Sequence, residues 1–334
     1  MAAPSCRLLG NGVTDDALLH IARFLSDPRD LLRLQLTCSR FAAKYITASS
    51  KGRGGAAAAP EMLSIPEEAA RRWVLSCSEQ ERGWVSFRTT ERWLCLMHEV
   101  EVLRLPLAFG RHADFTLSEN GALAARGGGA GIWRTAASEV VMRSGRHFAQ
   151  FTMVEGDSNA FFGVIRPGWD VEGGTNAMLV DGHCFYCTVN GLRFPGRHDW
   201  EGRQTTRQNG NHIGMLLDLD QGSMAVYKNG VLMGVMLAAG LTGPLRWAVT
   251  LLKGDSARID SALTPSSPTE EELAAAKESL WLEEGSIRNY LQSRKVTLSE
   301  FIRAFNAASQ RELKSAGGAH PSNRVLAFVA LALT

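Results

Sequence analysis

The chain has 334 residues, of which 45% are hydrophobic and 21% charged, and its formal net charge at pH 7 is +2. This composition is ordinary for globular protein and supplies enough apolar material for roughly two domains. The near balance of acids and bases gives no electrostatic reason to expect nucleic acid or an anionic membrane as the main partner.

Cysteine usage and hydropathy bear on where the protein works. The six cysteines lack the spacing of a small disulfide framework, and the first residues lack the charged and apolar regions of a secretory signal. The longest apolar run, Val325–Leu333, is much shorter than the ~20 residues that span a bilayer. We therefore expect an intracellular protein, in the cytoplasm or the nucleus, without a membrane partner. The cysteines are Cys6, Cys38, Cys77, Cys95, Cys184 and Cys187.

Residues 8–48 are expected to form three short helices. Thr14 or Asp15 can cap the first helix, and Phe41 and Tyr45, four residues apart, predict the third. So small a segment is not very stable alone and usually packs on something else. The apolar residues at helical spacing in the first two helices are Leu18, Ile21, Ala22, Leu25, Leu31, Leu34 and Cys38.

Two further segments follow before the composition changes. Residues 49–60 are rich in Gly and Ala without apolar periodicity, which predicts a flexible linker. Residues 61–112 are expected to form a helical connector. Its apolar positions are Ala69, Trp73, Leu75 or Cys77, and then Trp93, Leu96, Met97 and Val100.

Residues 113–263 have the pattern of an antiparallel β-sandwich. Many short strands separated by turn signals, with no helical pattern between them, are typical of that architecture. Asn229-Gly230 is the strongest short-range hairpin signal, so residues 213–237 are expected to form a three-stranded meander. Alternating apolar positions are Ile213, Met215, Leu217 and Leu219, and later Leu245, Trp247, Val249 and Leu251. Earlier strands are expected at 147–154, 161–165 and 185–189.

Residues 269–334 are expected to form a helical C-terminal tail after a Pro/Ser loop at 265–268. Thr269 can cap its first helix. The pattern as a whole predicts an α+β multidomain protein.

No motif points to a metal or to catalysis. Cys184 and Cys187 stand three apart in an expected strand, so they point to opposite faces and cannot share a tetrahedral metal. His98-Glu99 lacks the second histidine of a metalloprotease helix, because position 102 is Val102. The Gly-rich run 127–131 lacks the Lys-Ser/Thr ending of a phosphate loop. We therefore expect no catalytic residues, metal or cofactor.

The first segment resembles the F-box family. The resemblance rests on residues 13–25, on Asp27-Pro28-Arg29-Asp30-Leu31-Leu32 and on residues 37–41. Val13-Thr14 stands where the family usually has Leu-Pro, and Phe41 stands where the family usually has a late aromatic residue, often Trp. It implies docking on a Skp-type adaptor of a cullin–RING ubiquitin ligase. The resemblance places Pro28, Leu31 and Leu32 at the adaptor, and the apolar residues of the segment can serve its internal core, the partner surface or both. The candidate adaptor-binding residues are Leu18, Ile21, Leu25, Pro28, Leu31 and Leu32.

Residues 115–262 resemble the SPRY domain. The most specific part is Gly210-Asn211-His212-Ile213-Gly214 with the strand that follows it, then Val226-Tyr227-Lys228-Asn229-Gly230. Asn211 stands where many members carry Asp. The resemblance implies a sandwich that binds another protein.

Two loops of the sandwich carry aromatic and charged residues of the kinds enriched at binding hot spots. The alternative is that each tryptophan merely covers the end of the sandwich. The candidate partner-binding residues are Arg166, Trp169, Asp170, Arg197 and Trp200. Asp218 and Asp220 are expected to organise a strand end and its turn.

Together these features predict a substrate receptor of a Skp–cullin–F-box ligase, whose sandwich binds a protein or peptide target. The alternative is a SPRY-containing adaptor or scaffold unrelated to ubiquitin ligation. An enzyme has no supporting set of residues.

Overall fold

The computed structural model describes residues 14–25, 27–37, 39–42, 44–46, 62–87, 92–127, 132–156, 160–173, 176–196, 198–206 and 210–276. The chain divides into two compact units, 1–269 and 270–334, and of the second only the helical residues 270–276 are described. The predicted linker and most of the predicted tail lie outside the described residues. Within them, every helix is too short or too polar to cross a membrane.

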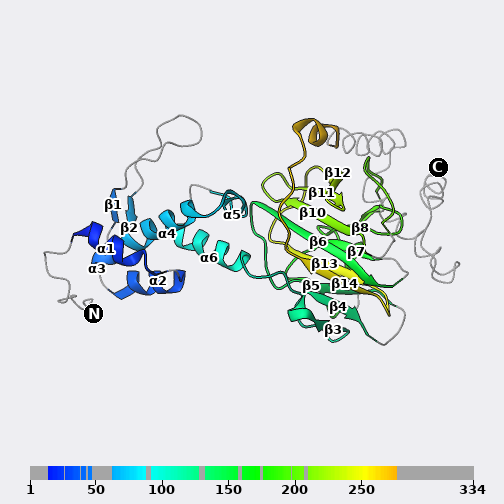
Figure 1. Ribbon diagram of the computed structural model, residues 1–334, viewed down its shortest axis with the longest axis horizontal. Helices are drawn as coiled ribbons and strands as arrows, with labels where there is room; N and C mark the ends of the chain where they lie inside the picture. The colour runs from blue at the N-terminus through cyan, green and yellow to red at the C-terminus, as the bar shows by residue number, and fades with distance from the viewer. Residues whose placement is uncertain are drawn as a thin grey trace, which may run out of the picture. The chain divides into compact units, whose positions relative to one another are not determined.

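The N-terminal part of the described chain is helical and carries one short strand pair (Figure 1). The two strands pair antiparallel, so they bring together the chain on either side of the predicted linker. The elements are α1 (Asp15–Ala22), α2 (Pro28–Thr37), α3 (Ser39–Ala42), β1 (Lys44–Ile46), β2 (Met62–Ser64), α4 (Ile65–Ser76), α5 (Glu79–Gly83) and α6 (Trp93–Leu103).

Side-chain caps fix where the first two helices begin. The side-chain oxygen of Thr14 accepts a hydrogen bond from the N–H of Ala17 at 3.3 Å, at the start of α1. Asp27 accepts one from the N–H of Arg29 at 2.7 Å, and Pro28 is the first residue of α2. These caps satisfy amides that a helix leaves unpaired at its N-terminus.

The predicted third helix is shorter than expected. Phe41 lies in α3 and is buried, but Tyr45 lies in β1, opposite Leu63 of β2. The expectation that Phe41 and Tyr45 share a helix is wrong, because strand pairing over a long sequence separation overrides the local spacing.

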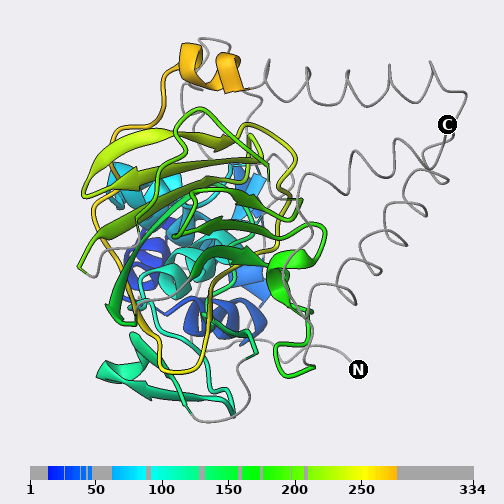
Figure 2. The same ribbon diagram turned by 90° about the vertical axis from the view of Figure 1, so that its right-hand side faces the viewer.

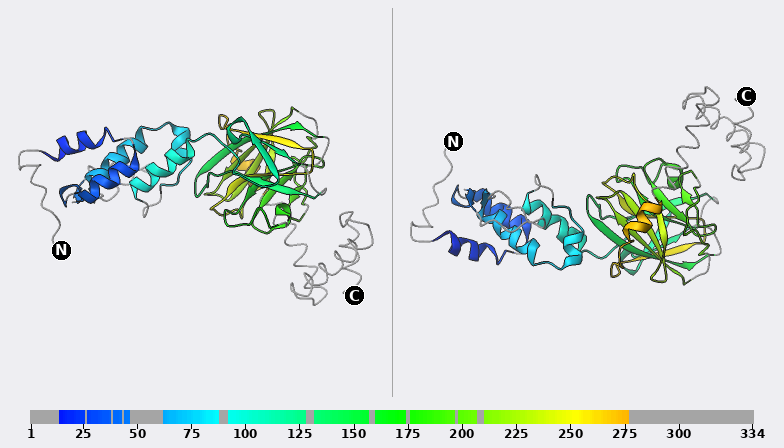
Figure 3. Two further views of the ribbon diagram at one scale, coloured as in Figure 1. Left: turned by 90° about the horizontal axis from the view of Figure 1, so that it is seen from below. Right: turned by 90° about the horizontal axis from the view of Figure 1, so that it is seen from above.

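Helix α4 is the centre of the helical region, since α1, α2 and α6 all contact it (Figure 3). Ala70 and Val74 of α4 are fully buried in the apolar cluster that these helices share. Met97 and Val100 of α6 enter the same cluster, as predicted for that face. The first helices therefore pack on the connector and do not stand alone.

The rest of the described chain forms two antiparallel sheets packed face to face (Figure 2). Within the described residues, the larger sheet has the order β12-β11-β10-β6-β14-β4-β3 and the smaller one β5-β13-β7-β8-β9. The strands are β3 (Phe115–Ser118), β4 (Leu123–Arg126), β5 (Arg134–Ala137), β6 (Arg146–Glu155), β7 (Phe161–Ile165), β8 (Cys184–Cys187), β9 (Arg193–Phe194), β10 (His212–Asp218), β11 (Ser223–Lys228), β12 (Val231–Leu237), β13 (Arg246–Leu251) and β14 (Ser256–Asp260). Two 3-10 helices, η1 (Glu119–Gly121) and η2 (Ala177–Leu179), lie between them.

The predicted meander is confirmed. Strands β10, β11 and β12 pair in order, and Asn229 and Gly230 join the last two with φ of 51° and 81°. Positive φ at both positions is what a tight hairpin of this kind requires. The alternating positions of β10, from Ile213 to Leu217, are buried together between the sheets.

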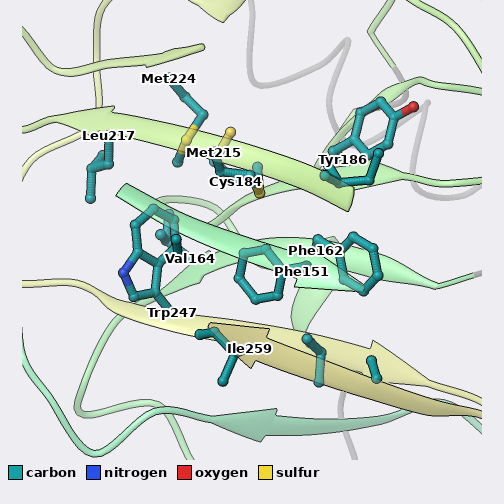
Figure 4. Packing of buried hydrophobic residues seen from close by; sticks show 14 of the residues in the cluster. Phe151, Phe162, Val164, Cys184, Tyr186, Met215, Leu217, Met224, Trp247 and Ile259 are labelled. Carbon is teal, nitrogen blue, oxygen red and sulfur yellow. The ribbon is translucent and has the colours of Figure 1, made fainter. Parts of the chain in front are cut away.

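Aromatic and aliphatic side chains together fill the space between the two sheets (Figure 4). Phe151 of the larger sheet stacks on Phe162 of the smaller sheet, with ring centroids 5.1 Å apart. Trp247 of β13 meets Phe151 edge-on and is 1% exposed. This core holds the sheets together and leaves recognition to the surface.

Candidate protein-interaction sites

The first two helices expose large apolar side chains. Ile21 and Phe24 near the end of α1 are 52% and 77% exposed, and Leu32 and Leu36 of α2 are 48% and 78% exposed. Leu32 and Leu36 are four residues apart and so share one face of the helix. We call these four residues the exposed apolar set.

The six residues predicted at the adaptor divide by burial. Leu18 and Leu31 are buried in the helical core, Pro28 is buried, and Leu25 is partly buried. Ile21 and Leu32 are the two that reach the surface.

Sequence periodicity misplaced two residues of α1 and missed two at the surface. Leu19 takes the place expected for Ile21 in the buried stripe of α1. Phe24 and Leu36 were not predicted to contact a partner. The signal was available, because Leu36 is apolar and lies off the buried stripe of α2, and Phe24 is apolar and lies just after the end of α1.

A buried carboxylate stabilises α4, on which α1 and α2 pack. Glu68 is 1% exposed and accepts hydrogen bonds from the guanidinium groups of Arg71 and Arg72, both at 2.6 Å. Burial alone would raise the pKa of Glu68, but the two arginines outweigh it and hold that pKa below its usual value. The carboxylate therefore stays charged and paired at neutral pH.

A small hollow of about 190 Å³ lies between α1 and α4. It is smaller than the roughly 300–1,000 Å³ of a usual small-molecule site. Its lining residues are Ala22, Arg23, Leu25, Ala69, Arg72, Trp73 and Ser76.

The second candidate site lies in the loop after β7. The guanidinium of Arg166 donates to the backbone oxygen of Thr242 at 2.8 Å and to its hydroxyl at 3.0 Å. The partly exposed ring of Trp169 meets His183 edge-on, with centroids 5.5 Å apart. Asp170 is exposed. The structure thus places Arg166, Trp169 and Asp170 in one loop, and the side chain of Arg166 ties that loop to Thr242 in the loop before β13.

His183 lies beneath Trp169. Its Nδ1 is 2.9 Å from the backbone oxygen of Ala177, and its Nε2 is buried without a hydrogen-bond partner among the described residues. Burial lowers the pKa of His183, so the ring is neutral at pH 7 with Nδ1 as the donor.

Trp200 has a different environment from Trp169. It is 8% exposed, its Nε1 donates to the backbone oxygen of Gly191 at 2.6 Å, and it packs into the cluster between the sheets. This burial favours the alternative in which Trp200 covers the end of the sandwich. Arg197 lies outside the described residues.

The Cys-x-x-Cys spacing behaves as expected from strand geometry. Cys184 packs into the core between the sheets, whereas Cys187 packs into a cluster on the outer side of the smaller sheet. Burial raises the pKa of the Cys184 thiol to about 12. Among the described residues, no three potential metal ligands lie close enough together to hold an ion.

Asp218 and Asp220 hold two different structures. Asp218 organises the turn, accepting from the N–H groups of Asp220 and Gln221 at 3.0 and 2.9 Å. Asp220 accepts from the N–H of Gly145 at 3.1 Å and from the hydroxyl of Ser86. The carboxylate of Asp220 thereby ties the connector to the sandwich, a role that the sequence did not reveal.

Comparisons with known proteins found one family match and several similar solved structures. The sequence model of the F-box-like family matches residues 15–43. Solved structures similar to the chain include the SPRY domain of human HERC1, at 18% identity over 47% of this chain and 99% of that one, with a TM-score of 0.40. The PSpry domain of TRIM65 is similar at 17% identity, over 48% of this chain and 95% of that one, with a TM-score of 0.38. No protein with a curated description matches.

The chain therefore carries an F-box-like segment followed by helices and an antiparallel sandwich. This combination indicates a protein-interaction protein.

Proposed function

We propose that this protein is the substrate receptor of a Skp–cullin–F-box ubiquitin ligase. The F-box-like segment binds a Skp-type adaptor, and the sandwich binds a protein or peptide target inside the cell, in the cytoplasm or the nucleus. The observation that carries the proposal is that the exposed apolar side chains and the F-box-like match fall in the same segment.

Burial of the exposed apolar set supplies the driving force for adaptor binding. Fully burying one large apolar side chain contributes about 1.5–3 kcal/mol. Phe24 and Leu36 are each more than three-quarters exposed, so most of that contribution is available to a partner. Leu31, in contrast, is 1% exposed and packs in the core that the helices share.

The receptor acts by tethering. Holding a target beside the ligase raises its effective concentration, so ubiquitin transfer gains without any chemistry by this chain. The role requires no catalytic residue and no cofactor of the chain.

The test is direct binding of the full chain to a purified Skp-type adaptor. Replacing Leu32 and Leu36 together by Asp should weaken binding about a hundredfold or more, because two apolar contacts become desolvated charges. Both side chains are exposed in the free protein, so its fold should persist.

The matched control is Val231→Asp, which places the same charge at a 70% exposed apolar position of the sandwich. Adaptor binding should survive that change. Absence of binding by the unaltered chain would overturn the ligase role. Capture of a protein target by the full chain, in a separate pull-down from a cell lysate, would then leave the scaffold alternative.

A further inference from the structure

The segment after β14 is fastened across the outer face of the larger sheet. Residues 261–269 form neither helix nor strand and run beside that sheet, in yellow to orange (Figure 1). The hydroxyl of Tyr227 donates to the backbone oxygen of Ser266 at 2.8 Å. The guanidinium of Arg146 donates to the hydroxyl of Ser267 at 2.7 Å. We call residues 261–269 the strap.

The surface beside these two bonds is apolar. Leu216, Ala225 and Tyr227 form a buried cluster on this face, with Phe148 and Leu232 packed partly buried against it. Tyr227 is 1% exposed, although it points away from the core between the sheets. Because the strap is bonded to Tyr227, its attachment helps to shield this cluster from solvent.

Arg146 has spare capacity to bind an anion. It is exposed, and among the described residues it forms no ion pair; the Ser267 hydroxyl accepts its hydrogen bond. The acid opposite it in register, Asp218, uses Oδ1 on backbone amides of its turn. A guanidinium offers five donors in a planar fork that suits phosphate oxygens.

Ser267 has the features of a phosphate acceptor. It is exposed, lies outside helices and strands, and precedes Pro268, which favours extended backbone at Ser267. We propose that Ser267 is a phosphorylation site and that Arg146 binds the phosphate, which fastens the strap to the sheet.

The reaction is ordinary phosphoryl transfer with a proline-directed protein kinase and ATP. The Ser267 oxygen forms a bond to the γ-phosphorus, the bond from that phosphorus to the β–γ bridging oxygen breaks, ADP leaves, and the kinase accepts the serine proton. The phosphate adds roughly 1.5–2 negative charges at pH 7. A hydrogen bond from a charged guanidinium to a neutral hydroxyl thereby becomes an ion pair between opposite charges.

The first experiment locates the modification. The full chain is incubated with a proline-directed kinase and ATP, and the phosphorylated residue is identified by mass spectrometry. Ser267→Ala should lose the phosphate. Thr264 is the other hydroxyl residue of the strap that is followed by a proline, and Thr264→Ala should keep the phosphate. Phosphate on Thr264 alone, or none on the strap, would overturn the site.

The second experiment tests the role of Arg146 by ³¹P NMR. The second pKa of a phosphoserine is near ~6, and a guanidinium beside it favours the dianion. That pKa should be lower by about half a unit or more in the unaltered chain than in Arg146→Gln. Arg143→Gln, at an exposed arginine nearby in the sequence, should match the unaltered chain.

The same samples report on the strap. Phosphorylation should slow amide exchange at Ser266 and Ser267 about tenfold in the unaltered chain and leave it unchanged in Arg146→Gln. Equal pKa values and equal exchange rates in the two proteins would overturn the binding of the phosphate by Arg146. These outcomes do not depend on whether the F-box-like segment binds an adaptor.

Discussion

The helical region and the sandwich handle their apolar residues differently. Phe24, just after α1, and Leu36 of α2 remain more than three-quarters exposed, whereas Phe151 and Trp247 of the sandwich are at most 1% exposed. A segment of F-box size has too little interior to bury all of its large side chains. We therefore expect exposed apolar surface to drive partner binding by the helical region. In the sandwich, we expect loops that combine aromatic and charged groups to drive it.

The two regions should differ most in how truncation of a large apolar residue affects stability. Trp247→Ala removes a ring buried between the sheets and should lower the free energy of unfolding by about 3–5 kcal/mol. Leu36→Ala should change it by no more than ~0.5 kcal/mol, because the side chain is exposed in the free protein. Thermal unfolding measures the change in the free energy of unfolding for each variant. Similar losses of stability in the two variants would contradict the difference between the regions.

Acid should destabilise the sandwich before it breaks the buried ion pairs of the helical region. Burial lowers the pKa of His147 from its usual 6.5 to about 4, against the opposing effects of the Ser144 carbonyl and Asp220. The unfolded chain therefore takes up a proton that the folded chain excludes, so stability is present above pH 6.5 and lost as the pH falls toward 4. The loss should be on the order of 3 kcal/mol.

The measurement is denaturant unfolding between pH 4 and pH 7.5, with His147→Gln as the comparison. That variant should show a weaker pH dependence, with a remainder from His183, whose pKa burial also lowers. Glu68, whose pKa is below its usual 4.5, contributes only at lower pH, where its arginine pairs are lost. An unchanged slope in His147→Gln would contradict the assignment.

The two candidate tryptophans should give opposite results. Trp169→Ala should weaken binding of the captured target by about 2 kcal/mol, roughly thirtyfold, with little change in melting temperature. Trp200→Ala should lower the melting temperature and leave the affinity of the folded fraction intact, because its ring and Nε1 are buried. Target titration and melting curves on both variants separate recognition from packing.

The smallest expected effect concerns the joint between the regions. Asp220→Ala removes the acceptor for the Gly145 amide and the Ser86 hydroxyl and should cost about 1–2 kcal/mol. Hydrogen exchange should then rise near residues 84–86 and 144–145, with the meander unaffected. Ser86→Ala removes one donor only and should have a smaller effect.

Local patterns predicted the elements whose partners are close in sequence. The meander follows from alternation in β10 and from Asn229-Gly230, because each strand pairs with its neighbour along the chain. The strand containing Tyr45 was missed because its partner Leu63 comes after the predicted linker. Helical spacing alone could not locate that pairing.

The candidate sites show the same limit. Periodicity identified apolar positions in α1 and α2 but not which of them face outward, so Phe24 and Leu36 were overlooked. The position of Trp200 between strands gave no sign of its bond to Gly191. Asp220 was assigned to its local turn, since its contact with Ser86 spans 134 positions of sequence.

The placement of the cysteines gives each region its own reporter of opening. Cys77 is buried in the helical core, while Cys184 and Cys187 are buried on opposite sides of β8. A buried thiol reacts with an alkylating reagent only when its surroundings open. Mass spectrometry of a briefly alkylated sample would therefore record, cysteine by cysteine, whether the helical region and the two faces of the smaller sheet come apart together or in turn.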